Sequence, residues 1–442
     1  MVFWSVCLRG VEARVEKAPD EIVLGVRDAW GREAPVSLFN DDRRQHVYMV
    51  GKSGTGKTTL LRNMILQDIK AGRGVGVIDP HGDLAADLLD HIPRHRIEHV
   101  TYFDPSDPEH SVGFNLLARV PPDKRHLVAS GVVAAFKGIF PDFFGPRMEY
   151  IFYAAVAALL DCQNVSLLGL QRMLTDERYR AWVVNQVKDP VVRAFWEHEF
   201  EAHDRKTKAE MVSPILNKVG PMLMTPQLRN ILGQVRSRID ARFMMDRGRI
   251  FIANLSKGKL GADKANLLGS FLVAQFQLAA MARADVPECD RRDFFLYVDE
   301  FQSFVSDSFA SILSEARKYR LCLVLSHQYL NQLKPGIADA VIGNVGSMVA
   351  FRVGHQDAEA LELAYGRTYP ASAFTSLSNG EIYVKLLSRG QDFEPFLART
   401  FAPRGERHGR RDRIICRSRE RYGEKRSVVE RRIEQWIKKS QR

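Results

Sequence analysis

Residues 51–58 read GKSGTGKT and follow the apolar stretch HVYMV at residues 46–50. They match the pattern G-x-x-x-x-G-K-[ST], in which glycines let the backbone wrap around phosphate groups with its N–H groups pointing inward. Residues 57–71 then carry apolar side chains at helical spacing, so the positive end of a helix dipole would face the same loop. Because a strand precedes the loop and a helix follows it, the segment predicts a phosphate-binding loop (P-loop) rather than an incidental glycine-rich turn.

The residue types of this P-loop predict its ligands. Lys57 is expected to reach the β- and γ-phosphates of ATP, and the Thr58 hydroxyl is expected to hold Mg²⁺. The nucleotide is expected to be bound by Gly51, Ser53, Gly54, Thr55, Gly56, Lys57, Thr58 and Thr59.

A P-loop needs a second, acidic element, and FFLYVDE at residues 294–300 supplies one. Asp299 ends an apolar strand, where its carboxylate is expected to hold the Mg²⁺ together with Thr58. Glu300 is placed to polarise the attacking water as the catalytic base. An apolar strand followed by Asp-Glu is common in itself, and the alternative is an ordinary carboxylate pair at the start of a loop. The P-loop upstream favours the catalytic interpretation.

The segment SEARKYRLCLVLSHQ at residues 314–328 predicts a helix with a basic end, followed by a strand. Gln328 ends that strand, where it is expected to sense the γ-phosphate or orient water. Arg317 lies near the helix end. It is either an arginine finger for the ATP of a neighbouring subunit or a helix C-terminal cation stabilised by the helix dipole. The residues alone leave both interpretations of Arg317 open.

A polar loop, IDPHGDL at residues 78–84, follows the next predicted strand. Its Asp79, His81 and Asp83 are expected at the sheet edge that carries the P-loop, where they could couple nucleotide state to a partner. The simpler alternative, which we favour slightly, is that Asp83 is an N-cap and His81 a hydrogen-bonding loop residue.

A second loop, SKGKLG at residues 256–261, also leaves a predicted strand. Its Lys257 and Lys259 could contact phosphate of ATP or DNA. We favour the interpretation that they are ordinary surface lysines.

The chain as a whole predicts an α/β fold with a mostly parallel central sheet and an inserted all-α domain. Apolar strands alternate with helices in residues 46–122 and 246–403, which would form the nucleotide-binding domain. Residues 123–245 are almost wholly helical in pattern and would form the inserted domain. A small β segment at residues 1–45 and a basic tail at residues 404–442 complete the chain.

Composition indicates a globular chain of 442 residues, 45% of them hydrophobic. We find no apolar run near the ~20 residues that span a bilayer. The longest, from Tyr150 to Leu160, is interpreted as a buried core helix, so no intrinsic membrane span is expected. The five scattered cysteines form no C-x-x-C pair, which is typical of a reducing cytoplasm.

The net charge of +11 is concentrated in the tail, because residues 404–442 hold fifteen lysines and arginines against six acidic residues. Such a tail could bind nucleic acid or an anionic membrane surface, or be only a solvated mixed-charge helix. Ser427 and Glu430 have the spacing of a capping box. An apolar stripe at helical spacing follows, and it is expected to dock on the body or on a neighbour. It consists of Val429, Ile433, Trp436 and Ile437.

These motifs together resemble a known family. GKSGTGKTTLL, IDPHGDL, the YVDE strand and the R-K-x-x-x-L…Q segment resemble the VirD4/TraD/TraG group, the coupling ATPases of conjugation and type IV secretion, which are related to the FtsK and HerA DNA pumps. The resemblance covers roughly residues 46–400 and is most specific at the P-loop and at residues 297–328. It implies a RecA-like P-loop NTPase fold in which the P-loop and acidic-pair residues hydrolyse ATP. It places Arg317 at the family's trans-acting arginine and Gln328 at its motif III glutamine.

The resemblance also implies a homo-oligomer, a hexameric ring with ATP between subunits and DNA passing through the central channel without sequence preference. Secretion-channel or relaxosome proteins would be its partners. The family's usual N-terminal transmembrane helices are missing from this sequence, so a cytoplasmic protein, membrane-associated through its partners, is expected.

Two other functions remain open at this point. One is a VirB4-like secretion ATPase that powers protein export or assembly and ignores DNA. The other is an ATP-gated DNA-binding scaffold subunit of a defence complex. The complete set of P-loop, acidic pair, arginine and glutamine argues against the scaffold, because a switch needs fewer parts.

Overall fold

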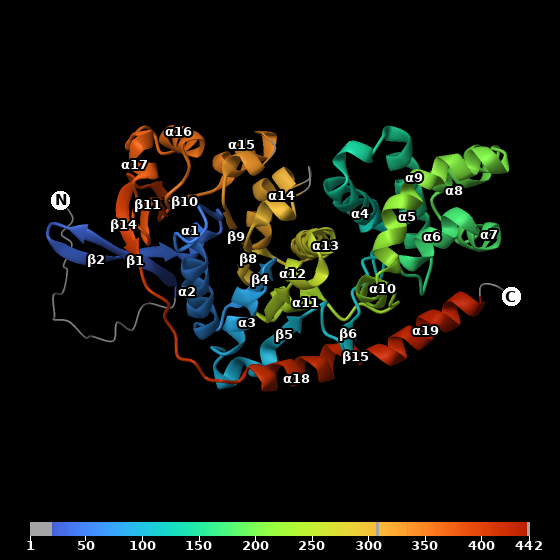
Figure 1. The fold of residues 1–442 in the computed structure, drawn as a ribbon, viewed down its shortest axis with the longest axis horizontal. Coiled ribbons are helices and arrows are strands. Elements are labelled where there is room, and N and C mark those ends of the chain that lie inside the picture. Colours follow the sequence, from blue (N-terminus) through green and yellow to red (C-terminus); the bar gives the residue numbers. More distant parts are fainter. Residues whose placement is uncertain (1–19, 306–308, 334, 440–442) are drawn as a thin grey trace.

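The computed structural model describes residues 20–305, 309–333 and 335–439. Within them, a large sheet has the strand order β2-β1-β14-β11-β10-β3-β9-β8-β4-β7-β5 (Figure 1). Its strands are β1 (Glu21–Ala29), β2 (Arg32–Phe39), β3 (Val47–Val50), β4 (Gly74–Asp79), β5 (Val100–Phe103), β7 (Ile250–Asn254), β8 (Phe294–Val298), β9 (Leu321–His327), β10 (Ser347–Ala350), β11 (Glu381–Lys385) and β14 (Phe396–Thr400).

The central part of this sheet is parallel. Every neighbouring pair from β10 through β3, β9, β8, β4 and β7 to β5 runs in the same direction. Parallel strands are covered on both faces and are therefore apolar along their whole length, as in FFLYV of β8, where all residues are buried. The predicted mostly parallel α/β fold is confirmed.

The described part of the predicted N-terminal β segment, residues 20–45, joins the same sheet, and residues 1–19 of that prediction lie outside the described residues. Its hairpin, β1 and β2, is antiparallel, and β1 pairs in turn with β14, so that Val26 faces Arg399. The connection from β2 to β3 includes a short helix, α1 (Asn40–Arg43), whose Arg43 is buried.

Two hydrophobic cores lie on the two faces of the sheet, because successive residues of a strand point to opposite faces. Val47 and Met49 of β3 belong to the core under α2 (Lys57–Lys70) and α3 (Asp83–Leu89). Tyr48 and Val50 belong to the core that includes α13 (Ala262–Met281).

A helical lobe lies beside the sheet, separate from the strands in Figure 1. It contains α4 (Arg125–Ile139), α5 (Pro146–Asp161), α6 (Leu168–Thr175), α7 (Glu177–Val184), α8 (Pro190–Ala194), a π-helix (Phe195–Phe200), α9 (Arg205–Met224) and α10 (Pro226–Leu232). A short helix, α11 (Ala241–Asp246), leads back to β7. The helical insertion thus accompanies the α/β fold as predicted.

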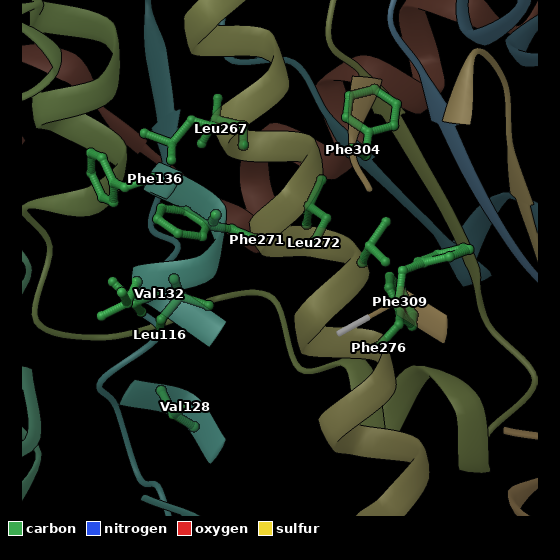
Figure 2. Close-up of a cluster of buried hydrophobic side chains, with 14 of the residues drawn as sticks. Leu116, Val128, Val132, Phe136, Leu267, Phe271, Leu272, Phe276, Phe304 and Phe309 are labelled. Atoms are coloured by element: carbon green, nitrogen blue, oxygen red, sulfur yellow. The ribbon is translucent and has the colours of Figure 1, made fainter. Parts of the chain in front are cut away.

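Helix α13 joins the lobe to the sheet. Figure 2 shows Phe136 and Val132 of α4 facing Phe271 of α13, and the Phe136 and Phe271 rings meet edge to face with centroids 6.1 Å apart. On the sheet side of α13, Phe276 stacks on Phe294 of β8 at 5.3 Å. This helix is therefore packed against both parts of the molecule.

Among the described residues, one helical segment, Ala262–Asp285, is long and apolar enough to cross a membrane by length and composition. It is α13 with its 3₁₀ extension, and 56% of its most apolar window is buried. Polar and charged residues interrupt this segment, so residues 150–160 remain the longest uninterrupted apolar run. The packing of α13 between sheet and lobe accounts for its apolar side chains.

The basic tail is ordered over its described part. It forms α18 (Arg411–Tyr422), β15 (Gly423–Lys425) and α19 (Arg426–Lys439), which run along the base of the molecule to the lobe (Figure 1). Strand β15 pairs antiparallel with β6 (His110–Val112). The tail therefore bridges the α/β part and the helical lobe.

The predicted capping box is wrong, and the predicted docking is confirmed. Helix α19 begins at Arg426, so Ser427 lies inside its first turn, and the Glu430 carboxylate accepts hydrogen bonds from Arg426 and Asn230. The pairing of β15 with β6 ends at Lys425 and the helix follows directly, two residues earlier than the local spacing suggests. Val429 and Ile433 are buried against the body, whereas Ile437 is 43% exposed.

Several arginines of the tail are paired with carboxylates of the body. Arg407 and Arg411 contact Asp90, Arg417 and Arg421 contact Glu98, and Arg419 contacts Asp107 and Glu109. Each pair has at least one partly exposed side chain, and surface pairs stabilise a protein by only about 0–1 kcal/mol each. These pairs nevertheless neutralise part of the positive charge that the sequence offered for binding nucleic acid.

Candidate functional site

The predicted catalytic residues gather where the parallel strands end. The P-loop follows β3, Gln328 follows β9, and Asp299 with Glu300 follows β8. These strands are neighbours in the order β3-β9-β8-β4, and Asp79 ends β4. Ligands of open α/β folds bind at this edge of the sheet.

The P-loop glycines are required by its geometry. Gly54 and Gly56 have φ values of 76° and 116°, a left-handed region that favours glycine. A Cβ on Gly51 would lie 2.5 Å from the Cβ of Phe351. Behind the loop, the Gly380 amide donates to the Thr55 carbonyl at 3.0 Å and fixes the turn.

The side chains at the other P-loop positions differ in how accessible they are to a ligand. Ser53 and Thr58 are exposed and Thr59 is partly buried. The Thr55 hydroxyl is buried and donates to the Lys52 carbonyl at 2.7 Å. Its side chain therefore stabilises the loop, which leaves ligand contact to its backbone.

The Lys57 ammonium is buried at the start of α2, and it donates to the carbonyls of Gly51 and of Lys52, the latter at 3.0 Å. Burial lowers the pKa of Lys57, and the nearby Glu300 and Asp299 oppose that shift. Among the described residues, no carboxylate forms an ion pair with this ammonium. A buried cation held by carbonyls, with a helix N-terminus beside it, fits a phosphate chain.

Asp299 is buried at the end of β8, where its Oδ1 accepts from the Ser326 hydroxyl at 2.9 Å and from the Glu300 amide at 3.1 Å. Burial raises the pKa of Asp299 to about 6, an effect that Asp79 and Glu300 reinforce and that Ser326 and Lys57 oppose. Because burial disfavours the charged carboxylate, a cation bound beside Asp299 would stabilise its charged form. Together with the Thr58 hydroxyl, this carboxylate offers the oxygen ligands that Mg²⁺ prefers.

Glu300 is held by two amides. Its Oε1 accepts from Gln328 at 2.8 Å and its Oε2 from Gln302 at 2.5 Å. Its backbone has a φ of 46°, a strained conformation for a non-glycine residue. Gln328, predicted to contact γ-phosphate or water, thus orients the Glu300 carboxylate in this structure. Gln302 was not predicted, since a glutamine two residues after an acidic pair gives no signal of its own.

Arg317 lies at the opposite end of the sheet. It is exposed in a 3₁₀ turn (Ala316–Tyr319) just before β9, whereas Gln328 follows the other end of that strand. A strand of seven residues spans roughly 20 Å, so Arg317 cannot reach the P-loop of its own chain. The structure does not bring it together with Lys57 and Glu300.

His46 ties the segment that carries Arg317 to the sheet. Its Nδ1 accepts from the Leu323 amide at 3.1 Å, which leaves Nε2 to donate to the Leu313 carbonyl at 3.0 Å. Leu313 belongs to α14 (Phe309–Glu315), which leads into the turn of Arg317. The ring is fully buried, and this burial, with help from Arg317, lowers the pKa of His46 to about 4.

This buried histidine predicts a pH-dependent stability. Because the folded pKa of about 4 lies below the ordinary 6.5, stability from neutral His46 is complete above pH 6.5 and is lost as the pH falls toward 4. By pH 5 the loss from this group is about 2 kcal/mol. In urea titrations, the gap in unfolding free energy between wild type and His46→Asn should narrow by that amount from pH 7 to pH 5. His95→Asn, which replaces an exposed histidine, is the control. A gap for His46→Asn that does not change between pH 7 and pH 5 would contradict the burial of a neutral His46.

The loop after β4 has a structural role at one of its predicted positions, Asp79. Asp79 is buried and accepts from the amides of His81 and Ala85 at 2.8 and 2.9 Å, which satisfies the start of α3. The predicted N-cap role of Asp83 is wrong, because Gly82 occupies the cap position and Asp83 is the first helical residue. The side chains of His81 and Asp83 are exposed.

The two lysines after β7 differ. Lys259 is exposed, as expected for a surface lysine. Lys257 is half-buried, and its Nζ donates to the Ser303 hydroxyl at 2.8 Å, three residues beyond Glu300. The interpretation of Lys257 as an ordinary surface residue is therefore wrong.

The strand order and the P-loop at this sheet edge give the chain a RecA-like P-loop fold. A family model, that of the DNA-binding domain of type IV secretion-system coupling proteins, matches residues 32–108. No curated protein sequence matches the chain.

Solved structures of coupling proteins have the same fold. The unbound bacterial conjugative coupling protein TrwB superposes with a TM-score of 0.65 at 14% identity, covering 89% of this chain and 91% of that one. TrwB in complex with ADP and Mg²⁺ gives 0.62 at 15% identity, with the same coverage. VirB4 of Thermoanaerobacter pseudethanolicus gives 0.58 at 15% identity, covering 89% of this chain and 98% of that one. The resemblance to type IV secretion ATPases that the motifs indicate is confirmed.

Proposed function

We propose that this chain is an ATP-hydrolysing motor that binds and translocates DNA as a ring of identical subunits, similar to the conjugative coupling proteins. The observation that carries the proposal is that three features lie at one edge of the sheet. They are the P-loop with its buried Lys57, the buried Asp299, and Glu300 with its carboxylate hydrogen-bonded to a side-chain amide. The coupling-protein DNA-binding model over residues 32–108 supports DNA as the cargo. Nucleotide complexes of the similar TrwB support ATP and Mg²⁺ as ligands.

In this proposal the residues of the edge divide the chemistry. Lys57 and the P-loop N–H groups would hold the β- and γ-phosphates of ATP. Thr58 and Asp299 would hold Mg²⁺, which neutralises charge on the phosphate oxygens when bound. Glu300 would accept the proton of the attacking water, because Gln328 orients its carboxylate for that task.

The position of Arg317 supports a ring. An exposed arginine far from its own P-loop can act on ATP only in another copy of the chain, and a trans-acting cation stabilises charge that develops during phosphoryl transfer. His46 would hold the segment of Arg317 against the sheet for this purpose. A hexamer, as the resemblance implies, would place each site between two subunits.

DNA would be held through its phosphates, so binding should be independent of sequence and should weaken as salt rises. The protein would act in the cytoplasm, at the membrane through secretion-channel or relaxosome partners. Because tail arginines such as Arg417 and Arg419 contact body carboxylates, channel loops rather than the tail would supply most DNA contacts.

A second candidate is a VirB4-like ATPase for protein export or assembly. It is favoured by the match to VirB4, which extends over 98% of that chain. Its turnover would not respond to DNA. A DNA-binding scaffold without turnover remains the third, and the oriented Glu300 argues against it.

The test is ATP turnover by purified protein with and without single- and double-stranded DNA, beside Lys57→Ala. We expect DNA to raise the rate, the increase to shrink between 50 and 200 mM salt, and Lys57→Ala to lose at least about 100-fold in rate. A Lys57-dependent rate that ignores DNA would replace the DNA motor by the secretion ATPase. No turnover under any condition would favour the scaffold.

A further inference from the structure

Lys257 lies in a loop whose backbone is fixed on both sides. Its amide donates to the Pro80 carbonyl at 2.8 Å, next to Asp79 at the catalytic sheet edge. It begins a short helix, α12 (Lys257–Leu260), and the chain then turns at Gly261, with φ of 85°, into α13. The lysine therefore stands between β7 and the helix that packs the helical lobe against the sheet.

The ammonium of Lys257 has an unusual environment. It is half-buried, and its hydrogen bond goes to the neutral hydroxyl of Ser303 at 2.8 Å. Among the described residues, no carboxylate lies within ion-pair distance of it. Burial lowers the pKa of Lys257, and Glu300 is the neighbouring charge that opposes the shift. Burying part of a cation without an ion pair costs free energy, so the position of Lys257 is better explained by function than by stability.

Ser303 connects this lysine to Glu300. A 3₁₀ turn, Phe301–Ser303, follows Glu300 directly, and the Ser303 amide donates to the Glu300 carbonyl at 3.0 Å. Because the left-handed backbone of Glu300 is strained, its neighbours must hold it in place. Gln302 and Gln328 hold the Glu300 side chain, and Lys257 holds the far end of the turn.

We propose that Lys257 is a positioning residue for ATP hydrolysis. Through Ser303 it fixes the turn that begins at Glu300, and it thereby connects α13 to the carboxylate that activates water. Since α13 also packs on α4 of the lobe, a shift of the lobe reaches Glu300 through this lysine. The proposal rests on the proposed ATPase function.

Steady-state kinetics test the role. Lys257→Ala should lower kcat about tenfold with KM for MgATP unchanged, because misplacing a catalytic group affects the transition state more than binding. Lys257→Arg, which keeps a donor and the charge, should recover most of the rate. Ser303→Ala should match Lys257→Ala, and the double variant should be no slower than either, because both remove one contact. Lys259→Ala is the control and should behave as wild type.

Hydrogen exchange without nucleotide gives a readout that does not depend on activity. In Lys257→Ala and Ser303→Ala, the amides of residues 299–305 should exchange faster, while α2 should be unchanged. If the wild type shows no ATP turnover but exchange is faster in the variants, the proposed function is refuted, while the role of Lys257 in holding the turn after Glu300 is supported. Unchanged exchange, an unchanged kcat, or multiplying losses in the double variant would overturn the proposal.

Discussion

Glu300→Gln is expected to lower kcat for ATP hydrolysis about 10²- to 10⁴-fold, the range attributed to a positioned general base. The substitution keeps the shape of the side chain at the end of β8 but removes the group that accepts a proton. The carboxylate is well prepared for that role, since Gln328 and Gln302 donate to its two oxygens at 2.8 and 2.5 Å.

ATP binding should survive Glu300→Gln, because the phosphate cradle at Lys57 does not depend on it. Turnover and the affinity for a fluorescent ATP analogue separate the two effects. Glu359→Gln, an exposed glutamate of α16 (His355–Ala364), is the matched control and should turn over normally. A Glu300→Gln variant with full activity would mean that another group activates the water.

Arg43→Ala is expected to destabilise the folded protein by about 3–5 kcal/mol, the usual result of removing one partner of a buried ion pair. Arg43 and Asp68 are both fully buried, and two hydrogen bonds of 2.9 and 2.7 Å join them. Tyr297 donates to the same carboxylate at 2.5 Å, and the Arg43 guanidinium lies 3.7 Å from the Phe295 ring centroid. Burial alone would raise the pKa of Asp68, but Arg43 and Arg73 hold it below its ordinary value.

The network joins three segments that lead to or from the candidate site. Asp68 belongs to the P-loop helix α2, Tyr297 to the strand that ends at Asp299, and Arg43 to the segment between the N-terminal hairpin and β3. Without Arg43, the Asp68 carboxylate keeps its hydrogen bonds from Arg73 and Tyr297 but loses two donors in a dry core.

Chemical denaturation of Arg43→Ala beside Arg44→Ala measures the effect. Arg44 is the adjacent residue, and its pair with Asp293 is partly exposed, so its loss should cost less than about 1 kcal/mol. Equal losses in the two variants would contradict a special role for the buried network.

The sequence predicts the chemical core of this protein because its signals are local. The P-loop is contiguous, and the apolar strand before Asp299 needs no partner to be recognised. The alternation of strands and helices likewise indicates a parallel sheet. Backbone geometry requires the glycines of the P-loop, and burial on both faces requires continuous apolar residues in a strand. Both requirements can be read directly from the sequence.

The features that sequence reasoning missed depend on residues far apart in the chain. Lys257 and Ser303 are 46 residues apart, and Arg43 and Tyr297 are 254 residues apart. The start of α19 depends on the pairing of β15 with a strand more than 300 residues earlier, so the local spacing of Ser427 and Glu430 is misleading. Arg317 illustrates the limit on the site itself, because only the strand direction shows that it lies away from its own P-loop.

The most direct test of the account is displacement of streptavidin from biotinylated DNA by the purified protein, a measure of movement rather than of turnover. We predict displacement that requires ATP and Mg²⁺, that slows with rising salt, and that is absent in Glu300→Gln although the variant still binds ATP. Displacement that is equally fast without ATP, or normal DNA-stimulated turnover without any displacement, would contradict the proposal that this chain is a DNA-translocating motor.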